Sequence, residues 1–153
     1  MKMVRVFVTG GAGFIGSHIC DRILDLGHEV VCFDNLATGF KENIEHLRKN
    51  SRFTFIEGDI RNTELLDIHI SDCTHVCHQA ALGSVPRSIE NPRRTNEFNI
   101  VGSLNVLTKA QEHSIDRVVF ASSSSVYGDN VDMPKFEDRT GNVLSPYAVT
   151  KSA

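Results

Sequence analysis

The stretch that decides the fold reads Thr9-Gly10-Gly11-Ala12-Gly13-Phe14-Ile15-Gly16. It follows an apolar run, residues 4–8, and it leads into a segment whose apolar residues recur every three or four positions, so the pattern predicts strand, glycine turn and helix. A tight reversal needs backbone angles that glycine adopts easily, and a pyrophosphate could lie against the bare backbone at the helix N-terminus. We expect one buried stripe on the helix, formed by Phe14, Ile15, Ile19, Ile23, Leu24 and Leu26.

The glycine spacing does not choose between two variants of a dinucleotide-binding turn. It fits both Gly11-x-Gly13-x-x-Gly16 and Gly10-x-x-Gly13-x-x-Gly16. The next predicted strand, residues 29–33, ends in Asp34, whose carboxylate could accept both hydroxyls of an adenosine ribose. An ordinary turn with a capping aspartate would give the same residues. The complete order of strand, glycines, helix, strand and acid favours the dinucleotide, and Asp34 would repel a 2′-phosphate, which favours NAD over NADP.

Composition restricts the class of protein. The chain has 153 residues, 41% of them hydrophobic, and a formal net charge of −3 with its basic residues scattered, so we expect one globular domain and no nucleic-acid or membrane surface. No apolar run has membrane length or resembles a signal peptide, which predicts a cytoplasmic protein. Cys73-x-His75-x-Cys77-His78 resembles a metal cluster. A strand would point residues 73, 75 and 77 to one face and His78 to the other, so we predict no metal site.

The rest of the chain alternates strands with helices. Strands are expected at residues 53–57, 75–79 and 117–121, the last of them apolar like a central strand, and helices at 41–49, 63–70 and 99–112. The last helix should pack on the sheet through Ile100, Leu104, Val106, Leu107 and Ala110. Residues 83–92 are expected to be a polar, proline-containing connection. The pattern therefore predicts an α/β fold, a Rossmann-type doubly wound parallel sheet with five strands in the order 3-2-1-4-5.

Polar residues follow several of these strands, at the edge where open α/β sheets bind ligands. Asp59 could face an adenine, or it could equally be a turn or capping carboxylate before the helix at 63–70. Ala80 and Ala81 are small enough to let a bound ring approach the backbone. The serine run 122–125 follows a buried strand directly, so we favour contact with substrate over a flexible linker.

The segment Leu144-Ser145-Pro146-Tyr147-Ala148-Val149-Thr150-Lys151 carries the chemistry. Ser145 suits a helix N-cap and Pro146 the first helical position, so Tyr147 and Lys151 should lie four apart on one helix face. A lysine ammonium stabilises a nearby phenolate, which makes Tyr147 a candidate base for a sugar hydroxyl. In isolation the pair could be a chance spacing. Here it accompanies a nucleotide site and a serine run.

With these motifs the chain resembles the extended short-chain dehydrogenase/reductases, and within them the nucleotide-sugar epimerases and dehydratases. The further marks of that resemblance are Asp34-Asn35, Gly58-Asp59-Ile60, His78-Gln79-Ala80-Ala81, Asn99 and Val126-Tyr127-Gly128. Residues 80–88 and 144–151 are most similar to UDP-N-acetylglucosamine 4-epimerases. The resemblance implies an NAD-dependent 4-epimerase of the UDP-N-acetylglucosamine or UDP-glucose type, with a UDP-sugar as its partner and a homodimer as a plausible full-length form.

The resemblance also implies roles for individual residues. Tyr147 would remove the 4-hydroxyl proton, Lys151 would lower the pKa of Tyr147 and bind the nicotinamide ribose, and Ser123 would hydrogen-bond the reacting oxygen. The hydride would pass from C4 to NAD and return on the other face of a 4-keto sugar. Gly83, Ser84, Ser123, Ser124 and Tyr147 would contact the sugar. NAD would be bound by Gly10, Gly13, Phe14, Ile15, Gly16, Asp34, Asn35, Thr38, Gly39, Asp59, Ile60, Gln79, Ala80, Ala81, Asn99, Tyr147 and Lys151.

Two departures from the family matter. Related dehydratases and decarboxylases have a threonine followed by carboxylates in the serine segment, whereas this chain has Ser123-Ser124-Ser125, so an epimerase is preferred over a dehydratase. A redox-inactive NAD-binding module would not need Ser123, Tyr147 and Lys151. Family members are about twice as long, so we expect residues 1–153 to form an incomplete NAD-binding domain that lacks the substrate domain and is inactive alone.

Overall fold

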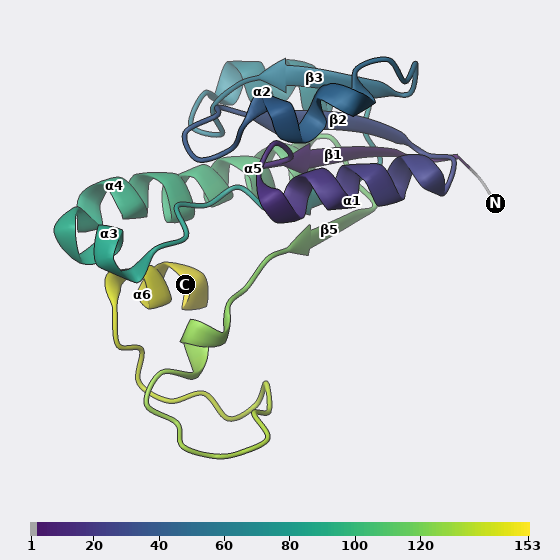
Figure 1. The fold of residues 1–153 in the computed structure, drawn as a ribbon. Helices are drawn as coiled ribbons and strands as arrows, with labels where there is room; N and C mark the ends of the chain where they lie inside the picture. The colour runs from purple at the N-terminus through teal and green to yellow at the C-terminus, as the bar shows by residue number, and fades with distance from the viewer. Residues whose placement is uncertain (1–2) are drawn as a thin grey trace. The chain divides into compact units, whose positions relative to one another are not determined.

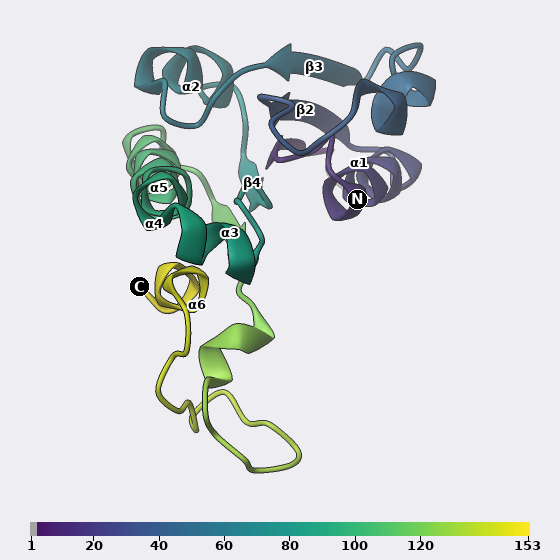
Figure 2. The ribbon, with the colours of Figure 1, turned by 60° about the vertical axis from the view of Figure 1, so that its left-hand side comes forward.

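A five-stranded parallel sheet, with strands in the order β3-β2-β1-β4-β5, confirms the predicted topology (Figures 1 and 2). The computed structural model describes residues 3–153. The strands are β1 (Arg5–Thr9), β2 (Glu29–Asp34), β3 (Phe53–Glu57), β4 (His75–His78) and β5 (Arg117–Phe120). Thr9 pairs with Phe33 on one side and with His78 on the other. The carboxyl ends of the strands therefore share one edge, where ligands of such sheets bind.

The chain divides into two compact units. The first contains residues 3–81 and 102–121 and includes the whole sheet, and the second contains residues 82–101 and 122–153. In the first unit, α1 (Phe14–Asp25) and the 3-10 helix η1 (Lys41–Leu47) cover one face of the sheet, while α2 (Thr63–Ile70) and α5 (Gly102–Glu112) cover the other (Figure 2). Successive strand residues point to opposite faces, so Val6 and Val8 pack with α1 and Phe7 with α2 and α5.

The buried faces of two helices differ from the prediction. In α1, Phe14, Ile15 and Leu26 are exposed, and the buried residues are Gly16, Ser17, Cys20 and Leu24. In α5, Leu104 and Leu107 are exposed, and the buried residues are Gly102, Ser103, Val106 and Ala110. The expected stripes were therefore wrong only in part. Leu24, Val106 and Ala110 are buried and Ile19 and Ile23 pack against the core as expected, but counting large apolar residues ignores the small residues that are buried with them.

Helix α3 (Val85–Glu90) occupies most of the segment 83–92 that was predicted to be a connection. A second short helix, α4 (Pro92–Asn96), follows it, and a π-helical turn η2 (Glu97–Val101) replaces the first turn of the predicted helix 99–112. Ser84 caps α3 and Asn91 caps α4 through their side chains, and each helix has a proline in its first turn. This combination of N-cap and proline is a helix start signal, and it was overlooked because the segment is polar.

Two expectations about the burial of strand residues differ from the structure. β5 lies at the end of the sheet order, as predicted, but Val119 and Phe120 are exposed although an apolar run is typical of a central strand. Cys73 and Cys77 do not share a face: Cys73 precedes β4 and lies in the core beside α2, whereas Cys77 packs toward α1. Within residues 3–153, no three His, Cys, Asp or Glu side chains are grouped to hold a metal ion. No helix in the same range is long and apolar enough to cross a bilayer.

A buried hydrogen-bond chain joins the ends of β1 and β4 to α5. The His78 ring has Nδ1 2.5 Å from the Thr9 hydroxyl and Nε2 2.8 Å from the Ser103 hydroxyl, and Thr9 Oγ1 also accepts from the Ala80 N–H at 3.2 Å. His78 and Thr9 are almost fully buried. Replacing His78 with an apolar side chain would remove one hydrogen bond from each of two buried hydroxyl groups, and a buried hydrogen bond that is lost costs about 1–3 kcal/mol.

We therefore expect His78→Leu to lower the free energy of unfolding by roughly 2–4 kcal/mol. Urea unfolding followed by circular dichroism measures the change. The double variant His78→Leu, Ser103→Ala removes the Ser103 hydroxyl and keeps Thr9 Oγ1 as the acceptor of the Ala80 N–H, so it should recover part of the loss. An unchanged urea midpoint for His78→Leu would show that the chain contributes nothing to stability.

Candidate active site

The glycine turn between β1 and α1 leaves no room for side chains at three positions. Gly10 has φ +67°, and a Cβ there would lie 2.7–2.9 Å from backbone atoms of Gln79 and Ala80. A Cβ at Gly16 would lie 2.1 Å from the carbonyl oxygen of Gly10. A Cβ at Gly11 would lie 2.5 Å from the Cys32 thiol sulfur in the core. The structure therefore crowds glycines that belong to each of the two spacings that the sequence left open.

The start of α1 fits a pyrophosphate. Gly13 is its N-cap and supplies no capping side chain, so no side chain occupies the N–H groups of the first turn. Helix N-termini bind anions through such N–H groups and the helix dipole. Phe14 and Ile15, predicted to contact the cofactor, are exposed at this end, 78% and 62% respectively. Both side chains were expected in a buried stripe, but because they are exposed they can cover a ligand.

Asp34 ends β2 directly beside the glycine turn. Its Oδ2 accepts from the Ala12 N–H at 3.0 Å and its Oδ1 from the Leu36 N–H at 2.7 Å. Burial raises the pKa of the Asp34 carboxyl, although both N–H groups act in the opposite direction. Each carboxylate oxygen has a further lone pair, so the group can still accept ribose hydroxyls. Gly39 packs on Ala12 and Asp34, which brings the loop that carries Thr38 onto the glycine turn.

Asp59 is a turn residue that holds an arginine. Arg61 donates to both Asp59 oxygens, Nε at 2.9 Å and Nη2 at 2.7 Å, and Asn35 Nδ2 donates to Oδ2 at 2.9 Å. The Arg61 guanidinium is the main reason that the pKa of Asp59 falls to about 2. The N-cap of α2 is Asn62, so Asp59 is not the capping residue. Its contact with an adenine stays a prediction.

The segment after β4 completes this edge of the sheet. The Gln79 N–H donates to the Thr9 carbonyl at 3.1 Å, and Ala80 and Ala81 are half-buried. The first unit thus contains most of the predicted cofactor residues, all following the carboxyl ends of β1, β2, β3 or β4. They are Gly10, Gly13, Phe14, Ile15, Gly16, Asp34, Asn35, Thr38, Gly39, Asp59, Ile60, Gln79, Ala80 and Ala81. Asn99, Tyr147 and Lys151 belong to the second unit.

In the second unit, helix α6 (Pro146–Ser152) presents Tyr147 and Lys151 one turn apart. Ser145 Oγ accepts from the Ala148 N–H at 3.1 Å, which confirms the predicted N-cap. The helix packs against α3, α4 and the 3-10 helix η3 (Ser124–Tyr127). Tyr147 is half-buried and Lys151 only 8% exposed, and this burial lowers the pKa of the Lys151 ammonium.

Asn99 anchors α6 rather than facing solvent. Its side chain is 2% exposed, its Oδ1 accepts from the Leu82 N–H at 2.8 Å, and its Nδ2 donates to Thr150 Oγ1 at 3.0 Å. Thr150 lies between Tyr147 and Lys151 in sequence. The amide therefore ties the helix with the candidate base to the start of the second unit, a role that the sequence did not reveal.

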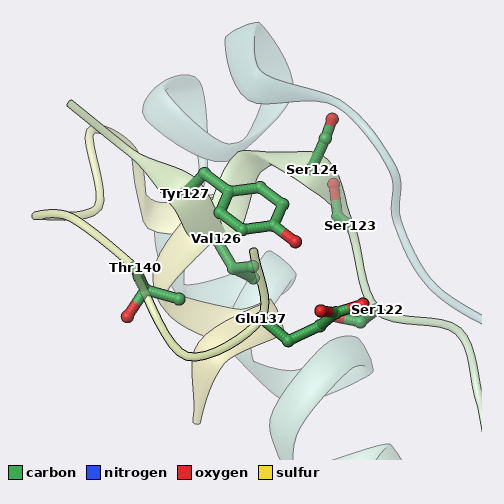
Figure 3. Close-up of a pocket in the computed structure, with 7 residues that line it drawn as sticks. All are labelled: Ser122, Ser123, Ser124, Val126, Tyr127, Glu137 and Thr140. Carbon is green, nitrogen blue, oxygen red and sulfur yellow. The ribbon is translucent and has the colours of Figure 1, made fainter. Parts of the chain in front are cut away.

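The serine segment lines a hollow of about 500 Å³ in the second unit (Figure 3). It is lined by Ser122, Ser123, Ser124, Val126, Tyr127, Glu137 and Thr140. A neighbouring hollow shares Ser122, Val126 and Thr140 with it and reaches Lys151. Ser123 Oγ accepts from the N–H and the hydroxyl of Ser125, at 3.2 and 2.9 Å.

Of the five residues predicted to contact the sugar, three lie outside the lining of both hollows: Gly83, Ser84 and Tyr147. Ser84 Oγ accepts from the Arg87 N–H at 3.3 Å as the cap of α3. Glu137 lines the first hollow and was missed, since it lies in an irregular loop without any motif.

Comparison with known proteins identifies the family. Residues 6–153 match the model of the NAD-dependent epimerase/dehydratase family. The chain belongs to this family. Its fold superposes with a TM-score of 0.93 and 41% identity on the UDP-N-acetylglucosamine 4-epimerase of Methanobrevibacter ruminantium in complex with UDP-N-acetylmuramic acid, covering 99% of this chain and 48% of that one. The UDP-glucose 4-epimerase of Thermus thermophilus in complex with NAD superposes with a TM-score of 0.86 and 40% identity, and the match covers 97% of this chain and 47% of that one.

Other members of the epimerase/dehydratase family carry out different reactions. UDP-glucuronic acid decarboxylase 1 of Arabidopsis thaliana is 39% identical over 142 residues, which cover 93% of this chain and 31% of the plant protein. The chain spans about half the length of the two epimerases and a third of the decarboxylase. It therefore corresponds to the NAD-binding portion of a nucleotide-sugar epimerase/dehydratase, and the family alone leaves the reaction open.

Proposed function

We propose that this chain is part of an NAD-dependent nucleotide-sugar 4-epimerase whose substrate is a UDP-sugar of the UDP-N-acetylglucosamine or UDP-glucose type. The observation that carries the proposal is the placement of Tyr147 and Lys151 one turn apart on α6, which packs against the segment that begins with Ser123. The likeness to two proteins named as 4-epimerases supports the choice of reaction. Residues 1–153 would then be the NAD-binding domain, completed by a substrate domain elsewhere in the full-length protein.

The chemistry that NAD supplies when bound is reversible hydride transfer at C4 of the sugar. The Gly10–Gly16 turn would hold the pyrophosphate, Asp34 the adenosine ribose, and Ala80 and Ala81 would lie against a ring. Tyr147, as phenolate, would take the proton of the sugar 4-hydroxyl, and the Lys151 ammonium would stabilise that phenolate. Ser123 would hydrogen-bond the reacting oxygen. Once the 4-keto sugar has turned over so that the other face of C4 receives the hydride, Tyr147 would return the proton to the oxygen on C4.

A nucleotide-sugar dehydratase is the second candidate, and Glu137 is the observation in its favour. Elimination of water needs an acid in addition to the tyrosine, and Glu137 shares a hollow with the serine segment. The serine segment itself has no carboxylate, so the epimerase remains our proposal. A redox-inactive NAD-binding module would leave Ser123, Tyr147 and Lys151 without a role.

The natural full-length protein, incubated with NAD and either UDP-glucose or UDP-N-acetylglucosamine, tests the function directly. We expect chromatography to show the 4-epimer, whereas a 4-keto-6-deoxy sugar would identify a dehydratase. The absence of both products would contradict the proposal. The 153-residue chain alone is expected to be inactive. It spans about half the length of the two epimerases, and the proposed substrate domain lies outside it.

NAD should bind more tightly than NADP, because the Asp34 carboxylate accepts ribose hydroxyls and opposes a 2′-phosphate. Asp34→Asn keeps the shape of the side chain and removes its charge. We expect Asp34→Asn to weaken NAD binding by about tenfold, since a hydrogen bond to a charged group contributes about 1.5–3 kcal/mol, and to narrow the preference for NAD over NADP. Calorimetric titration of both cofactors measures the two affinities.

Glu57→Gln is the matched control for Asp34→Asn. Glu57 ends β3 at the same edge of the sheet but pairs with Lys41 at 2.8 Å and is exposed. Glu57→Gln should leave the affinities for NAD and for NADP unchanged. Tighter binding of NADP than of NAD by the unmodified chain would remove Asp34 from its proposed role.

A further inference from the structure

Leu36, in the loop that follows β2, has a backbone conformation that its own side chain disfavours. Its φ is +57°, in the left-handed region. There the Cβ of an L-residue crowds the following carbonyl oxygen, so glycine, asparagine and aspartate are the usual occupants and a leucine is uncommon. Within residues 3–153, Ser114 is the one other non-glycine residue with a positive φ. A strained backbone persists where surrounding contacts hold it, and such residues cluster at ligand-binding sites.

The contacts that hold Leu36 come from its side chain and from its neighbours. The side chain is half-buried and packs against the core on the face of the sheet that α1 covers. Asn35 fixes the chain on either side: its Oδ1 accepts from the Ala37 N–H at 3.0 Å, and its Nδ2 donates to Asp59 Oδ2 at 2.9 Å. Burial of the leucine side chain therefore offsets the unfavourable φ, and the Asn35 contacts keep the loop in place.

The left-handed conformation lets Leu36 make two contacts at once. Its N–H donates to Asp34 Oδ1 at 2.7 Å, the short distance typical of a bond to a charged acceptor, while its side chain packs against the core. The φ angle is the rotation about the bond between the backbone nitrogen and Cα. A negative φ would swing the side chain and the following residues relative to the N–H group, so one of the two contacts would be lost.

The N–H groups of Leu36 and Ala12 together fix the Asp34 carboxylate. They donate to different oxygens, Oδ1 and Oδ2 respectively. Two bonds to different oxygens set both the rotamer and the plane of the carboxylate, and each oxygen keeps a further lone pair. The direction of these remaining lone pairs, which would accept ribose hydroxyls, thus depends on the backbone of Leu36.

We propose that Leu36 is a positioning residue for cofactor binding: its left-handed backbone holds its N–H on Asp34 and so aims the carboxylate at the adenosine ribose. The inference rests on the proposed function, because it takes Asp34 as the group that accepts the ribose hydroxyls. When the loop leaves this conformation, the Asp34 carboxylate is no longer aimed. The observed affinity for NAD then falls in proportion to the fraction of the protein that keeps the conformation.

Two substitutions of Leu36 separate its backbone from its side chain. Leu36→Ile keeps the size and apolarity, but a β-branched residue fits the left-handed region least. Leu36→Gly removes the side chain but adopts this φ freely. In the natural full-length protein we expect Leu36→Ile to weaken NAD binding by about tenfold and to narrow the preference for NAD over NADP, whereas Leu36→Gly should stay within about threefold of the unmodified protein. Calorimetric titration with each cofactor measures the affinities.

Ser114→Thr is the matched control. It places a β-branched residue at the other left-handed position, which precedes the amino end of β5 and so lies at the edge of the sheet opposite the cofactor residues. Its NAD affinity should not change. The amide proton of residue 36, followed by NMR in the free protein, is a second readout. Its bond to the carboxylate shifts it downfield, and that shift should be lost in Leu36→Ile and in Asp34→Asn but kept in Leu36→Gly.

The order of the two affinities decides between backbone and side chain. Weaker NAD binding by Leu36→Gly than by Leu36→Ile would show that the side chain matters, and it would overturn the inference. An unchanged amide shift in Leu36→Ile would overturn it as well. Both results would leave the epimerase proposal standing, since the unmodified protein would still bind NAD and form the 4-epimer. If the unmodified protein bound no NAD, the proposed function and the inference would fail together.

Discussion

Replacing Tyr147 with phenylalanine should lower kcat for 4-epimerisation by at least about 10²- to 10⁴-fold in the natural full-length protein, the usual contribution of a positioned acid or base. The hydroxyl would be the only group in the proposal that takes the substrate proton, and phenylalanine keeps the ring and the packing of α6. Most of the proposed NAD contacts lie in the first unit, so NAD affinity should change by less than about threefold. Ser123→Ala should have a smaller effect, because it removes a hydrogen bond to the reacting oxygen and leaves the base in place.

The control for Tyr147→Phe is Val149→Ala on the same helix. Val149 is 48% exposed, and its truncation should leave kcat unchanged. The assay follows conversion of UDP-glucose or UDP-N-acetylglucosamine by chromatography, with NAD binding measured separately by calorimetry. A Tyr147→Phe protein that turns over at the unmodified rate would refute Tyr147 as the base.

A side chain at Gly16 should disrupt the glycine turn and abolish cofactor binding. The first added carbon would lie 2.1 Å from the Gly10 carbonyl oxygen and 2.8 Å from Gly10 C and Gly11 Cα. All three are backbone atoms, so α1 would have to move away from the turn. Overpacking of this kind costs about 1–3 kcal/mol and occasionally more, and the displaced helix N-terminus would no longer face a pyrophosphate.

We expect Gly16→Ala to lower the free energy of unfolding by about 3 kcal/mol and NAD affinity by more than tenfold. Gly83→Ala is the matched control, because a Cβ there meets nothing within 4 Å and its stability should not change. Urea unfolding and calorimetric titration measure the two effects. A Gly16→Ala chain of normal stability that binds NAD normally would show that the turn can rearrange cheaply.

The sequence predicted the topology because its signals are local and repeated. Each strand is a short apolar run followed by a turn, and the carboxylate at Asp34 and the N-cap at Ser145 are set by their immediate neighbours. Spacing could not predict which helix faces are buried. Gly16, for example, is buried because it lies against the backbone of Gly10 and Gly11, and such a close approach is a tertiary property.

The site residues that escaped prediction depend on contacts between distant parts of the chain. Asn99 looks like a ligand-binding polar residue, yet its amide bonds to Leu82 and Thr150, which are far from it in sequence. Glu137 is part of no periodic pattern and enters the hollow only because Asp129 and Asn142 close its loop. Neither residue lies in a local sequence pattern that would have predicted its contacts.

The burial of Asp34 links cofactor binding to protons. The pKa of its carboxyl is raised, so in the free chain it takes up a proton at a pH where a fully solvated aspartate is still ionised. Ribose hydroxyls would donate to the ionised form, and binding would therefore draw the equilibrium toward it and release the proton. Below the raised pKa of Asp34, each further fall in pH would weaken NAD binding. The loss of affinity would therefore begin at a higher pH than it would with an exposed aspartate in this place. The side chain proposed to select NAD would thereby also set the lowest pH at which NAD stays bound.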